Sequence, residues 1–495
     1  MEIFNIYVLT IVLSLGLIGV VSSLFSGKKK LPPGPFPLPI VGNLFQLGKK
    51  PHKSLANLAK IHGPLISLKL GQTTSIVISS PSLAKEIFQT HDLNFSDRII
   101  SNTFQAHDHH NFSMIFLPVG PSWRNLRKIS NSYVFSNHKL DSNQHLRTSK
   151  IQKLISYVEQ SSCTGKPVEF DQLAFRTSFD VLSGDILSLD MADSKSLELK
   201  ELVRCIADES VKANLVDYFP LLTKIYPQGL KNRLTVLIGR LFDLFDSIFD
   251  ERLQAREEQS YISTNDMLDS LFSLTPGNKE HIDRTTIKHL FMDLLTAGTD
   301  TTSSTLEWAM AELLRNPGTL RKAREELVQI IGRDKVVNES DVAQLPYLRA
   351  IIKETLRLHP AAPLLVPRKA GADVEIGGYI IPKDAQVMVN AWAMGRDPSV
   401  WENPELFMPE RFLGSAVDAR GQHFELIPFG SGRRICPGMP LAIRMLHLML
   451  ASLIHRFDWK LEDGVEPESL DMDDNFGTTV HKAQPLRAIP IQLNY

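Results

Sequence analysis

Cysteine is scarce in this chain: three occur among 495 residues, Cys163, Cys205 and Cys436. An odd and sparse set is a poor basis for the disulfide framework of a small secreted domain. We therefore expect Cys163 and Cys205 to be free thiols. Cys436 differs from both because glycines surround it.

An excess of charge of either sign is also absent. Lysine and arginine number 54, aspartate and glutamate number 55, and the formal net charge is -1. Domains that bind nucleic acids usually carry a strong positive field, so no nucleic-acid partner is expected. Hydrophobic residues make up 43% of the chain and charged residues 22%, which predicts a folded globular body.

Residues 43–495 contain no internal repeat, no low-complexity tract and no linker-like change of composition. One large domain over residues 43–495 is therefore the better interpretation. The G-x-G-x-x-G fingerprint of dinucleotide-binding folds is also missing, because Gly430 and Gly432 belong to the loop of Cys436. No dinucleotide-binding domain is therefore expected within this chain.

Charge is missing altogether from Ile3 to Gly27, and this run is mostly apolar. A helix of ~23 residues spans roughly 34 Å, enough to cross the core of a bilayer. The lysines at positions 28–30 follow at once, and such positive flanks stay in the cytosol. We expect residues 1–27 to be a single-pass anchor in the endoplasmic reticulum membrane, with the body in the cytosol. The alternative, a cleaved signal peptide, would carry its positive charge before the apolar run.

The remaining elements are predicted to be mainly helical, with small sheets at one side. Residues 28–42 are basic and rich in proline, which predicts a stiff hinge. Alternating β-branched residues predict a hairpin over residues 64–80 that turns at Gly71 and Gln72. A second hairpin is expected over residues 375–395, with its turn near residues 382–384. The end of the chain, residues 478–493, is again strand-like.

Cys436 lies in the segment Phe-Gly-Ser-Gly-Arg-Arg-Ile-Cys-Pro-Gly, residues 429–438, directly before a strongly helical stretch from Met439 to Phe457. Glycines permit backbone geometries that other residues avoid. A helix N-terminus favours negative charge, so the thiol pKa is expected to be lowered and the thiolate favoured. A thiolate of this kind can bind iron directly and promote cleavage of an O–O bond. The alternative is a buried structural cysteine in a glycine turn.

A long helix is expected from Asp283 to Asn316, ended by Pro317 and Gly318. Its centre, residues 297–302, has the sequence Ala-Gly-Thr-Asp-Thr-Thr, which is poor in helix formers. Weak helix formers in the middle of a long helix suggest a functional site, and helices are often locally widened at such sites. Ala297 and Gly298 would let a flat cofactor approach the backbone. Thr301 and Asp300 offer an alcohol and an acid that could relay protons. The alternative is that the threonines only bond to their own helix carbonyls.

These segments together resemble the cytochrome P450 family, and the resemblance extends over nearly the whole chain from the proline-rich hinge. Phe429, Gly432, Arg434, Cys436 and Gly438 match its haem-binding signature. The resemblance implies the cytochrome P450 fold, haem b as cofactor, and a monooxygenase that uses dioxygen. It also implies electrons from NADPH through a separate reductase.

The resemblance also assigns roles to particular residues. Cys436 would be the axial iron ligand, and Phe429 would shield its sulfur. Gly432 and Gly438, with Ala297 and Gly298, would make room for the haem. Arg434 would pair with a haem propionate, as would Trp123, Arg127 and Arg368, whereas Arg124 would face solvent. Thr301 and Asp300 would relay protons, and Glu354, Arg357 and Arg411 would form a buried structural triad.

A substrate pocket of mainly apolar residues is implied in the same way, and about half of them are expected to be ordinary core. These residues are Phe104, Phe112, Ile115, Phe116, Phe291, Leu294, Leu295, Leu364, Leu365, Val366 and Phe476. Such a lining suits a lipophilic substrate. The loop with His107, His109 and His110 is interpreted as a polar access loop rather than as a metal site.

Within the family the chain is most similar to the plant microsomal subgroup that includes geraniol hydroxylases and abietane diterpene oxidases. A terpenoid hydroxylase is therefore the leading hypothesis. A tyrosine or phenol hydroxylase of the same subgroup stays open at this point. So do a haem-thiolate isomerase or dehydratase, which would use no external oxygen, and a non-enzymatic haem sensor.

Overall fold

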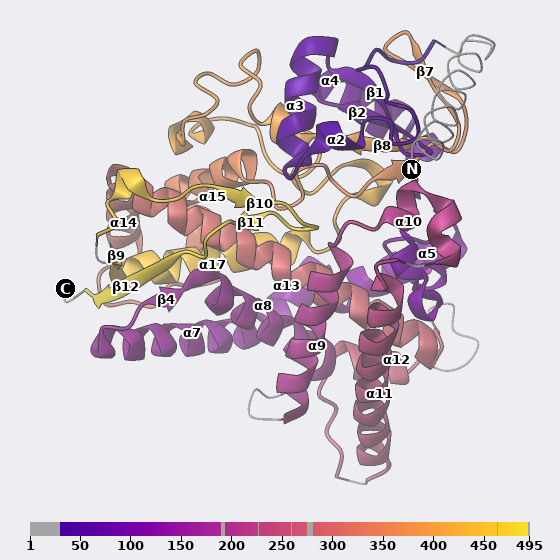
Figure 1. Ribbon diagram of the computed structural model, residues 1–495. Helices are drawn as coiled ribbons and strands as arrows, with labels where there is room; N and C mark the ends of the chain where they lie inside the picture. The colour runs from indigo at the N-terminus through magenta and orange to yellow at the C-terminus, as the bar shows by residue number, and fades with distance from the viewer. Residues whose placement is uncertain are drawn as a thin grey trace, which may run out of the picture.

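The computed structural model describes residues 30–189, 194–225, 227–258, 260–274, 281–462 and 464–493. Helices dominate, and the sheets lie at the margins of the helical body (Figure 1). The predicted fold class, mainly helical with small sheets, is confirmed for this part of the chain. The predicted membrane anchor, residues 1–27, lies outside it, and no helix within it is long and apolar enough to cross a membrane.

The longer helices are α3 (Pro51–His62), α5 (Pro121–Ser130), α7 (Gln144–Thr164), α8 (Phe170–Leu187), α9 (Ser194–Ser210), α11 (Leu230–Glu257), α13 (Arg284–Arg315), α14 (Pro317–Ile331), α15 (Pro346–Leu358) and α17 (Met439–Arg456). Shorter helical segments are α2 (Leu44–Leu47), α4 (Pro81–Lys85), η1 (Glu86–Thr90), η2 (Asp92–Phe95), η3 (Asn102–Asn111), η4 (Asn131–Phe135), α6 (Asn137–Ser142), α10 (Leu215–Tyr218), η5 (Pro220–Lys224), α12 (Met267–Phe272), η6 (Glu339–Gln344), α16 (Ala391–Met394), η7 (Pro409–Phe412), η8 (Gly432–Arg434) and η9 (Pro467–Ser469).

The largest sheet has the strand order β1 (Leu65–Leu70), β2 (Thr73–Ile78), β8 (Gln386–Val389), β5 (Arg368–Lys369) and β3 (Asp97–Arg98). A second sheet has the order β4 (Val168–Glu169), β12 (Arg487–Gln492) and β9 (Phe457–Leu461). Two further pairs are β6 (Val374–Ile376) with β7 (Tyr379–Ile381) and β10 (Asp474–Asn475) with β11 (His481–Lys482). The first sheet lies beside α3 and α4, and the second lies near the C-terminus (Figure 1).

One predicted hairpin is confirmed and the other is wrong. β1 and β2 are antiparallel and turn between Leu70 and Thr73. The second turn lies at Gly377 and Gly378 instead of residues 382–384, because these glycines adopt the left-handed φ values of 55° and 78° that the turn needs. β8 follows that hairpin in the chain but is not part of it. It pairs in parallel with β2, and its apolar side chains are buried there.

The predicted long helix is confirmed as α13, and the Asp283 side chain caps its N-terminus by accepting a bond from the Thr286 amide at 2.7 Å. The suggested widening at its centre is wrong, since the α-helix continues without a break through residues 297–302. α13 packs against α8, α9, α15 and α17, so that most of its side chains are buried. Because neighbouring elements hold this helix on nearly all sides, side chains on two different faces of it are kept in fixed positions.

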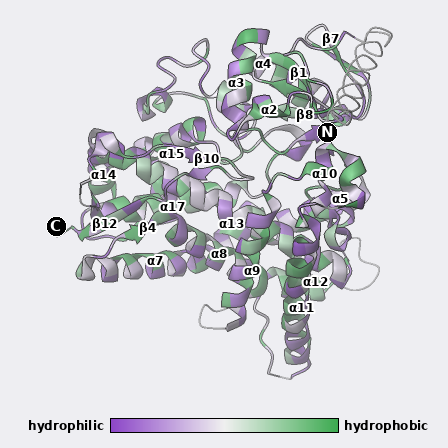
Figure 2. Cartoon of the chain, in the orientation of Figure 1, coloured by the Kyte–Doolittle hydropathy of each residue, from purple (hydrophilic) through white to green (hydrophobic). Residues whose placement is uncertain are grey.

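The proline-rich segment is docked on the body along the residues that the structure describes, 30–42, and is not a free strut. The Ser67 amide donates to Pro33 O at 2.8 Å, and the Ile380 amide donates to Lys30 O at 2.8 Å. Gly34 permits this contact, because a Cβ at that position would lie 2.0 Å from Ser67 O. Along helices such as α7 and α11, hydrophobic and hydrophilic residues both occur (Figure 2).

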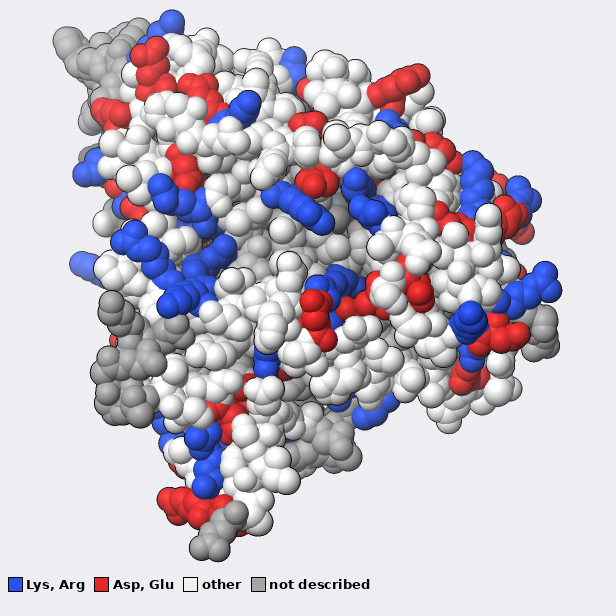
Figure 3. Space-filling view, turned by 180° about the vertical axis from the view of Figure 1, so that it is seen from behind, with Lys and Arg blue, Asp and Glu red and all other residues white. Residues whose placement is uncertain are grey.

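Both basic and acidic side chains occur on the face seen from behind, and several basic ones gather to the left of its centre (Figure 3). Inside the body, a charged group is fully enclosed. Glu354 accepts bonds from Arg357 at 2.7 and 2.8 Å, from Arg411 at 3.0 Å and from the Met408 amide at 2.7 Å. Glu354 and Arg357 are essentially inaccessible to solvent. These contacts join α15 to η7. The three residues of the predicted triad, Glu354, Arg357 and Arg411, are therefore in direct contact.

We expect Glu354→Gln to lower the free energy of unfolding by about 3–5 kcal/mol, because it leaves two buried guanidinium groups without their counter-charge. The measurement is denaturant unfolding of the holoprotein. Glu375→Gln, at an exposed position of β6, is the matched control and should change stability little. Equal stability of the two variants would contradict the structural role of the triad.

Candidate active site

A cavity of about 280 Å³ lies between α13, α17 and the loop that carries Cys436. Its walls include Cys436, Phe429 and Gly438 from that loop, and Ala297, Gly298 and Thr301 from α13. Further walls come from α5, α8 and the segment after α15. The sequence-predicted cysteine loop and the centre of the long helix are therefore brought to opposite sides of one cavity.

The Cys436 loop is held by its own backbone. The Cys436 amide donates to Phe429 O at 3.0 Å, and the next helix, α17, begins three residues later. Burial raises the pKa of the Cys436 thiol above its usual value, and the amides of Gly438 and Met439 with the Arg127 charge offset this only in part. The amides at the helix N-terminus lower the thiol pKa, as predicted, but burial outweighs them, so the predicted net lowering does not hold for the chain by itself.

The two signature glycines serve different purposes. Gly438 lines the cavity beside Cys436. Gly432 does not line it, and a Cβ there would lie 2.5 Å from an Asp92 carboxylate oxygen and 2.7 Å from Phe88 O. With its left-handed φ of 68°, Gly432 is needed for the close approach of the loop to η1 and η2.

Four guanidinium groups converge on the cavity: those of Arg98, Arg127, Arg368 and Arg434. Three of them were expected from the sequence, and Arg98 was missed. Arg98 is the direct cross-strand partner of Arg368 where β3 pairs with β5. Like charges placed opposite each other in a sheet repel, so this pairing needs an anion nearby.

The basic cluster is desolvated and only partly neutralised. Burial and the neighbouring Arg368 and Arg434 hold the pKa of Arg98 well below its usual value. Burial likewise lowers the pKa values of Arg368 and Arg434 to about 10, against the opposing charge of Asp92. The buried Nε of Arg98 has no hydrogen-bond partner in the described chain. The cluster is therefore a site for an anionic group.

Trp123 and two of these arginines form a stack at the edge of the cavity. The guanidinium carbons of Arg434 and Arg127 lie 4.9 and 5.6 Å from the Trp123 ring centre. Arg127 donates to Ile435 O at 2.8 Å, which ties α5 to the cysteine loop. Arg124 is exposed, as predicted.

These residues fit haem. A cysteine sulfur is a soft iron ligand, and carboxylates such as the two haem propionates suit guanidinium groups. The unpartnered Arg98 Nε and the cross-strand Arg98–Arg368 pair show that the cluster is built for negative charge. Arg98, Arg127, Arg368 and Arg434 are thus the residues that could hold the propionates, while Cys436 could hold the iron.

On α13, the side chain of Thr301 lines the cavity, but its hydroxyl donates to Ala297 O at 2.9 Å. Thr302 bonds in the same way to Gly298 O at 3.2 Å. In the structure, therefore, both threonine hydroxyls bond to carbonyls of their own helix, which was the alternative to a proton relay. Gly298 lines the cavity and also allows α13 to approach α8, since a Cβ there would lie 2.6 Å from a Leu182 methyl carbon.

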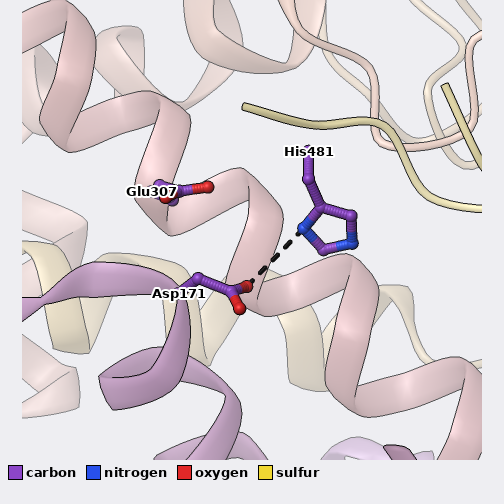
Figure 4. Close-up of side chains that lie close together, drawn as sticks. All are labelled: Asp171, Glu307 and His481. Atoms are coloured by element: carbon purple, nitrogen blue, oxygen red, sulfur yellow. Dashed lines mark ion pairs between the residues drawn. The ribbon is translucent and has the colours of Figure 1, made fainter. Parts of the chain in front are cut away.

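Asp300 does not line the cavity. Its carboxylate accepts a bond from His481 Nε2 at 3.1 Å, and the other ring nitrogen of His481 lies 3.6 Å from Asp171 (Figure 4). Glu307 lies on the same side of α13, and burial raises its pKa to about 7. Asp300 thus belongs to a charged cluster on the side of the helix that meets β11.

The predicted substrate residues divide into two groups. Ile115, Leu294, Leu365 and Val366 line the cavity. The others do not: Phe104, Phe112, Phe116, Phe291, Leu295, Leu364 and Phe476. They pack in clusters of side chains outside the cavity. For example, the Phe291 ring packs on Phe245 and Phe249, and the Phe476 ring stacks on His52.

Among the cavity residues that escaped sequence reasoning, two are charged, Arg98 and Asp293. The signal for Arg98 was weak, because a single arginine in a two-residue strand has no pattern of its own. Asp293 gave a better signal, since a carboxylate four residues before Ala297 shares its helix face. The polar interpretation of the His109 loop is also incomplete, because His109 is buried and contacts Asp293 at 3.1 Å.

His481 generates a prediction for stability against pH. Burial opposes its charge, but the bonds to Asp171 and Asp300 outweigh burial and raise its pKa to about 10. The unfolded value is about 6.5, so the stabilisation is fully present below pH ~6.5 and is lost as the pH rises through about 10. We expect His481→Gln to cost about 1–3 kcal/mol at pH 6, and the difference from wild type to shrink toward pH 10.

The measurement for His481 is denaturant unfolding of both proteins across this pH range. His138→Gln, at an exposed histidine of α6, serves as the control and should show no pH-dependent difference. A His481→Gln difference that stays constant from pH 6 to 10 would refute the ion-pair account.

Comparison with known proteins agrees with this geometry. The sequence profile of the cytochrome P450 family matches residues 32–486. The chain is 52% identical to geraniol 8-hydroxylase of Catharanthus roseus over 489 residues, which cover 98% of this chain and 99% of that protein. It is 49% identical to drimenol monooxygenase of Persicaria hydropiper, with coverage of 94% and 93%.

A solved zebrafish cytochrome P450, determined with progesterone, has the same fold, with a TM-score of 0.76 at 23% identity. The superposition covers 89% of this chain and 99% of the zebrafish chain. The profile and the two plant relatives extend over almost the entire sequence, including the cysteine loop and α13. This chain therefore belongs to the cytochrome P450 family and is a haem-dependent monooxygenase.

Proposed function

We propose that this chain hydroxylates a lipophilic terpenoid, a monoterpenol or a diterpenoid. One atom of dioxygen enters a C–H bond, and the other leaves as water with two electrons and two protons. The observation that carries the proposal is the cavity, in which apolar side chains from α13 and the segment after α15 face Cys436. Relatives at 52% and 49% identity are named for acting on geraniol and drimenol, which supports a terpenoid.

Each group around the cavity has a proposed task. Cys436 would hold the haem iron through its sulfur, and Phe429 would shield that sulfur. The four arginines and Trp123, which all line the cavity, would hold the haem propionates. When bound, the haem supplies the iron at which dioxygen is activated. Ile115, Leu294, Leu365 and Val366 exclude water and hold the substrate.

Thr301 and Asp300 are proposed to handle the protons. The Thr301 hydroxyl lies at the cavity wall, where it can donate once its bond to Ala297 O is exchanged. Asp300, one residue earlier, is linked through His481 to the partly exposed side of the helix. This arrangement lets Asp300 take up protons from outside without opening the apolar cavity to water.

We also propose that the chain is a single-pass protein of the endoplasmic reticulum membrane, with residues 43–495 as one cytosolic domain. Large apolar side chains are exposed at the start of the described chain and beside α10: Phe36, Ile40, Phe45, Leu221 and Ile225. The turn of β1 and β2 joins both segments, because the Gly71 amide donates to Val41 O and the Gln72 amide to Tyr218 O. Such a patch suits contact with lipid.

Electrons are proposed to arrive from a separate NADPH–cytochrome reductase. Arg124 and Lys128 are exposed on α5, the helix that Arg127 joins to the cysteine loop, and Arg433 is exposed in that loop. Basic side chains at this place suit an acidic flavoprotein surface and shorten the electron path to the haem.

The function is tested by product analysis of the full chain in microsomes with a reductase. Geraniol, an abietane diterpene and tyrosine are offered side by side, with and without NADPH. We expect a hydroxylated terpenoid that forms only with NADPH. Turnover of tyrosine alone would remove the terpenoid assignment, and product formation without NADPH or oxygen would indicate an isomerase or dehydratase.

Thr301→Ala tests the proton relay. We expect the product formed per NADPH consumed to fall by about 10²-fold or more, the usual contribution of a positioned proton donor. Thr299→Ala is the matched control, because Thr299 bonds to its helix in the same way but does not line the cavity. Equal losses in both variants would show that the effect comes from the helix and not from the hydroxyl.

A further inference from the structure

Asp293 holds a loop against α13 at the edge of the cavity. Its carboxylate accepts bonds from the Ser113 hydroxyl at 2.8 and 2.9 Å, from the Met114 amide at 2.7 Å, and it lies 3.1 Å from His109 Nε2. All four residues are at most 7% exposed. A buried carboxylate with this many donors is strongly oriented, and so are the donors.

The network extends from His109 to His289, the residue one turn before Asp293 on α13. The Nδ1 atoms of His109 and His289 lie 2.9 Å apart. Two facing ring nitrogens bond only when one of them carries the hydrogen, so the tautomer of each histidine is set by the other and by Asp293. Burial, followed by the charges of the neighbouring histidines, lowers the pKa of His289 to about 3, which keeps its ring neutral.

The loop that these residues hold has little regular structure of its own. His107 and Asp108 have left-handed φ values of 49° and 53°, and the helical segment η3 is kinked there. At its start the loop is tied to Asp217, which accepts a bond from the Asn102 amide at 2.7 Å. Side-chain contacts therefore decide where the loop lies.

The part of the loop that faces the cavity is held from two sides. Met114 and Ile115 line the cavity, and the Ile115 amide donates to the Ser113 hydroxyl at 3.1 Å. On the other side Arg434 donates to the carbonyls of Met114 and Ile115 at 3.3 and 3.5 Å. The cavity-facing residues of the loop thus lie between Asp293 on α13 and an arginine of the cysteine loop.

We propose that the buried network of His289, His109, Asp293 and Ser113 fixes Met114 and Ile115 over the cavity and thereby determines which lipophilic substrates fit. His289, His109 and Ser113 are positioning residues, since they act through the loop. The inference rests on the proposed function, because it concerns the shape of the substrate cavity of that activity.

His289 permits a test that separates hydrogen bonding from packing. Its ring stacks on Phe112 at 4.7 Å and meets the edge of Phe242 at 4.7 Å. His289→Phe keeps an aromatic ring of similar size in this stack but removes the nitrogen that faces His109. If His289 is only a core aromatic residue, the phenylalanine will replace it without consequence.

The experiment compares wild type, His289→Phe and Asp185→Asn as full-length holoproteins. Amide hydrogen exchange is measured at Met114 and Ile115, and KM and kcat are measured with geraniol as the probe. For His289→Phe we expect about tenfold faster exchange at Met114, the loss that a weakened bond to a charged acceptor produces. KM for geraniol should rise several-fold more than kcat falls, and the ratio of product isomers should change.

Asp185→Asn is the control because Asp185, on α8, is also a buried carboxyl bonded by one neighbour, Asn143, but it does not line the cavity. Its exchange at Met114, its KM and its product ratio should equal those of wild type. Wild-type exchange and KM in His289→Phe would overturn the proposal. If that variant does not fold, Ser113→Ala is measured in the same way and the same two outcomes decide.

Failure of the proposed function can be told apart from failure of this inference. If wild type does not convert geraniol, the terpenoid assignment loses its support, while amide exchange still reports on the loop. Faster exchange at Met114 in His289→Phe then supports the network, and unchanged exchange overturns it.

Discussion

Four guanidinium groups that line the same cavity as the Cys436 thiol are the constraint on which the rest of this structure depends. Arg98 and Arg368 face each other across two strands, and Arg127 and Arg434 stack on Trp123. Such a cluster is costly without a matching anion, so haem propionates held there would contribute to the fold as well as to the chemistry. The short strands β3 and β5, helix α5 and the cysteine loop are all positioned by arginines of this cluster.

In the proposed function, helix α13 supplies both the proton-relaying and the substrate-selecting sides of the site. Along one face Asp293, Ala297 and Thr301 follow one another at intervals of four residues and line the cavity. Asp300 lies on the side that meets β11 and bonds to His481. The helix can serve these two environments because it is buried on nearly all sides and unbroken, so a shift on one side would disturb the other.

Sequence reasoning succeeded where the signal is local. The cysteine loop, the span of α13, the β1–β2 hairpin and the pair Glu354–Arg357 are all encoded within short stretches. It failed where the signal is a contact between distant segments. Arg98 acquires its meaning only when β3 pairs with β5, Phe476 leaves the cavity because it stacks on His52, and β8 exchanges its expected partner for β2. The thiol pKa was misjudged because burial, which sequence does not show, outweighs the helix N-terminus.

The most direct test of the central claim is the absorption spectrum of the reduced, haem-loaded protein with carbon monoxide, recorded for wild type and Cys436→Ala. Cys163→Ala serves as the control, because Cys163 is an exposed thiol far along the chain from the cysteine loop. The account predicts the signature of thiolate-ligated iron in wild type and in Cys163→Ala, and its loss in Cys436→Ala. A thiolate signature that persists in Cys436→Ala would contradict the account.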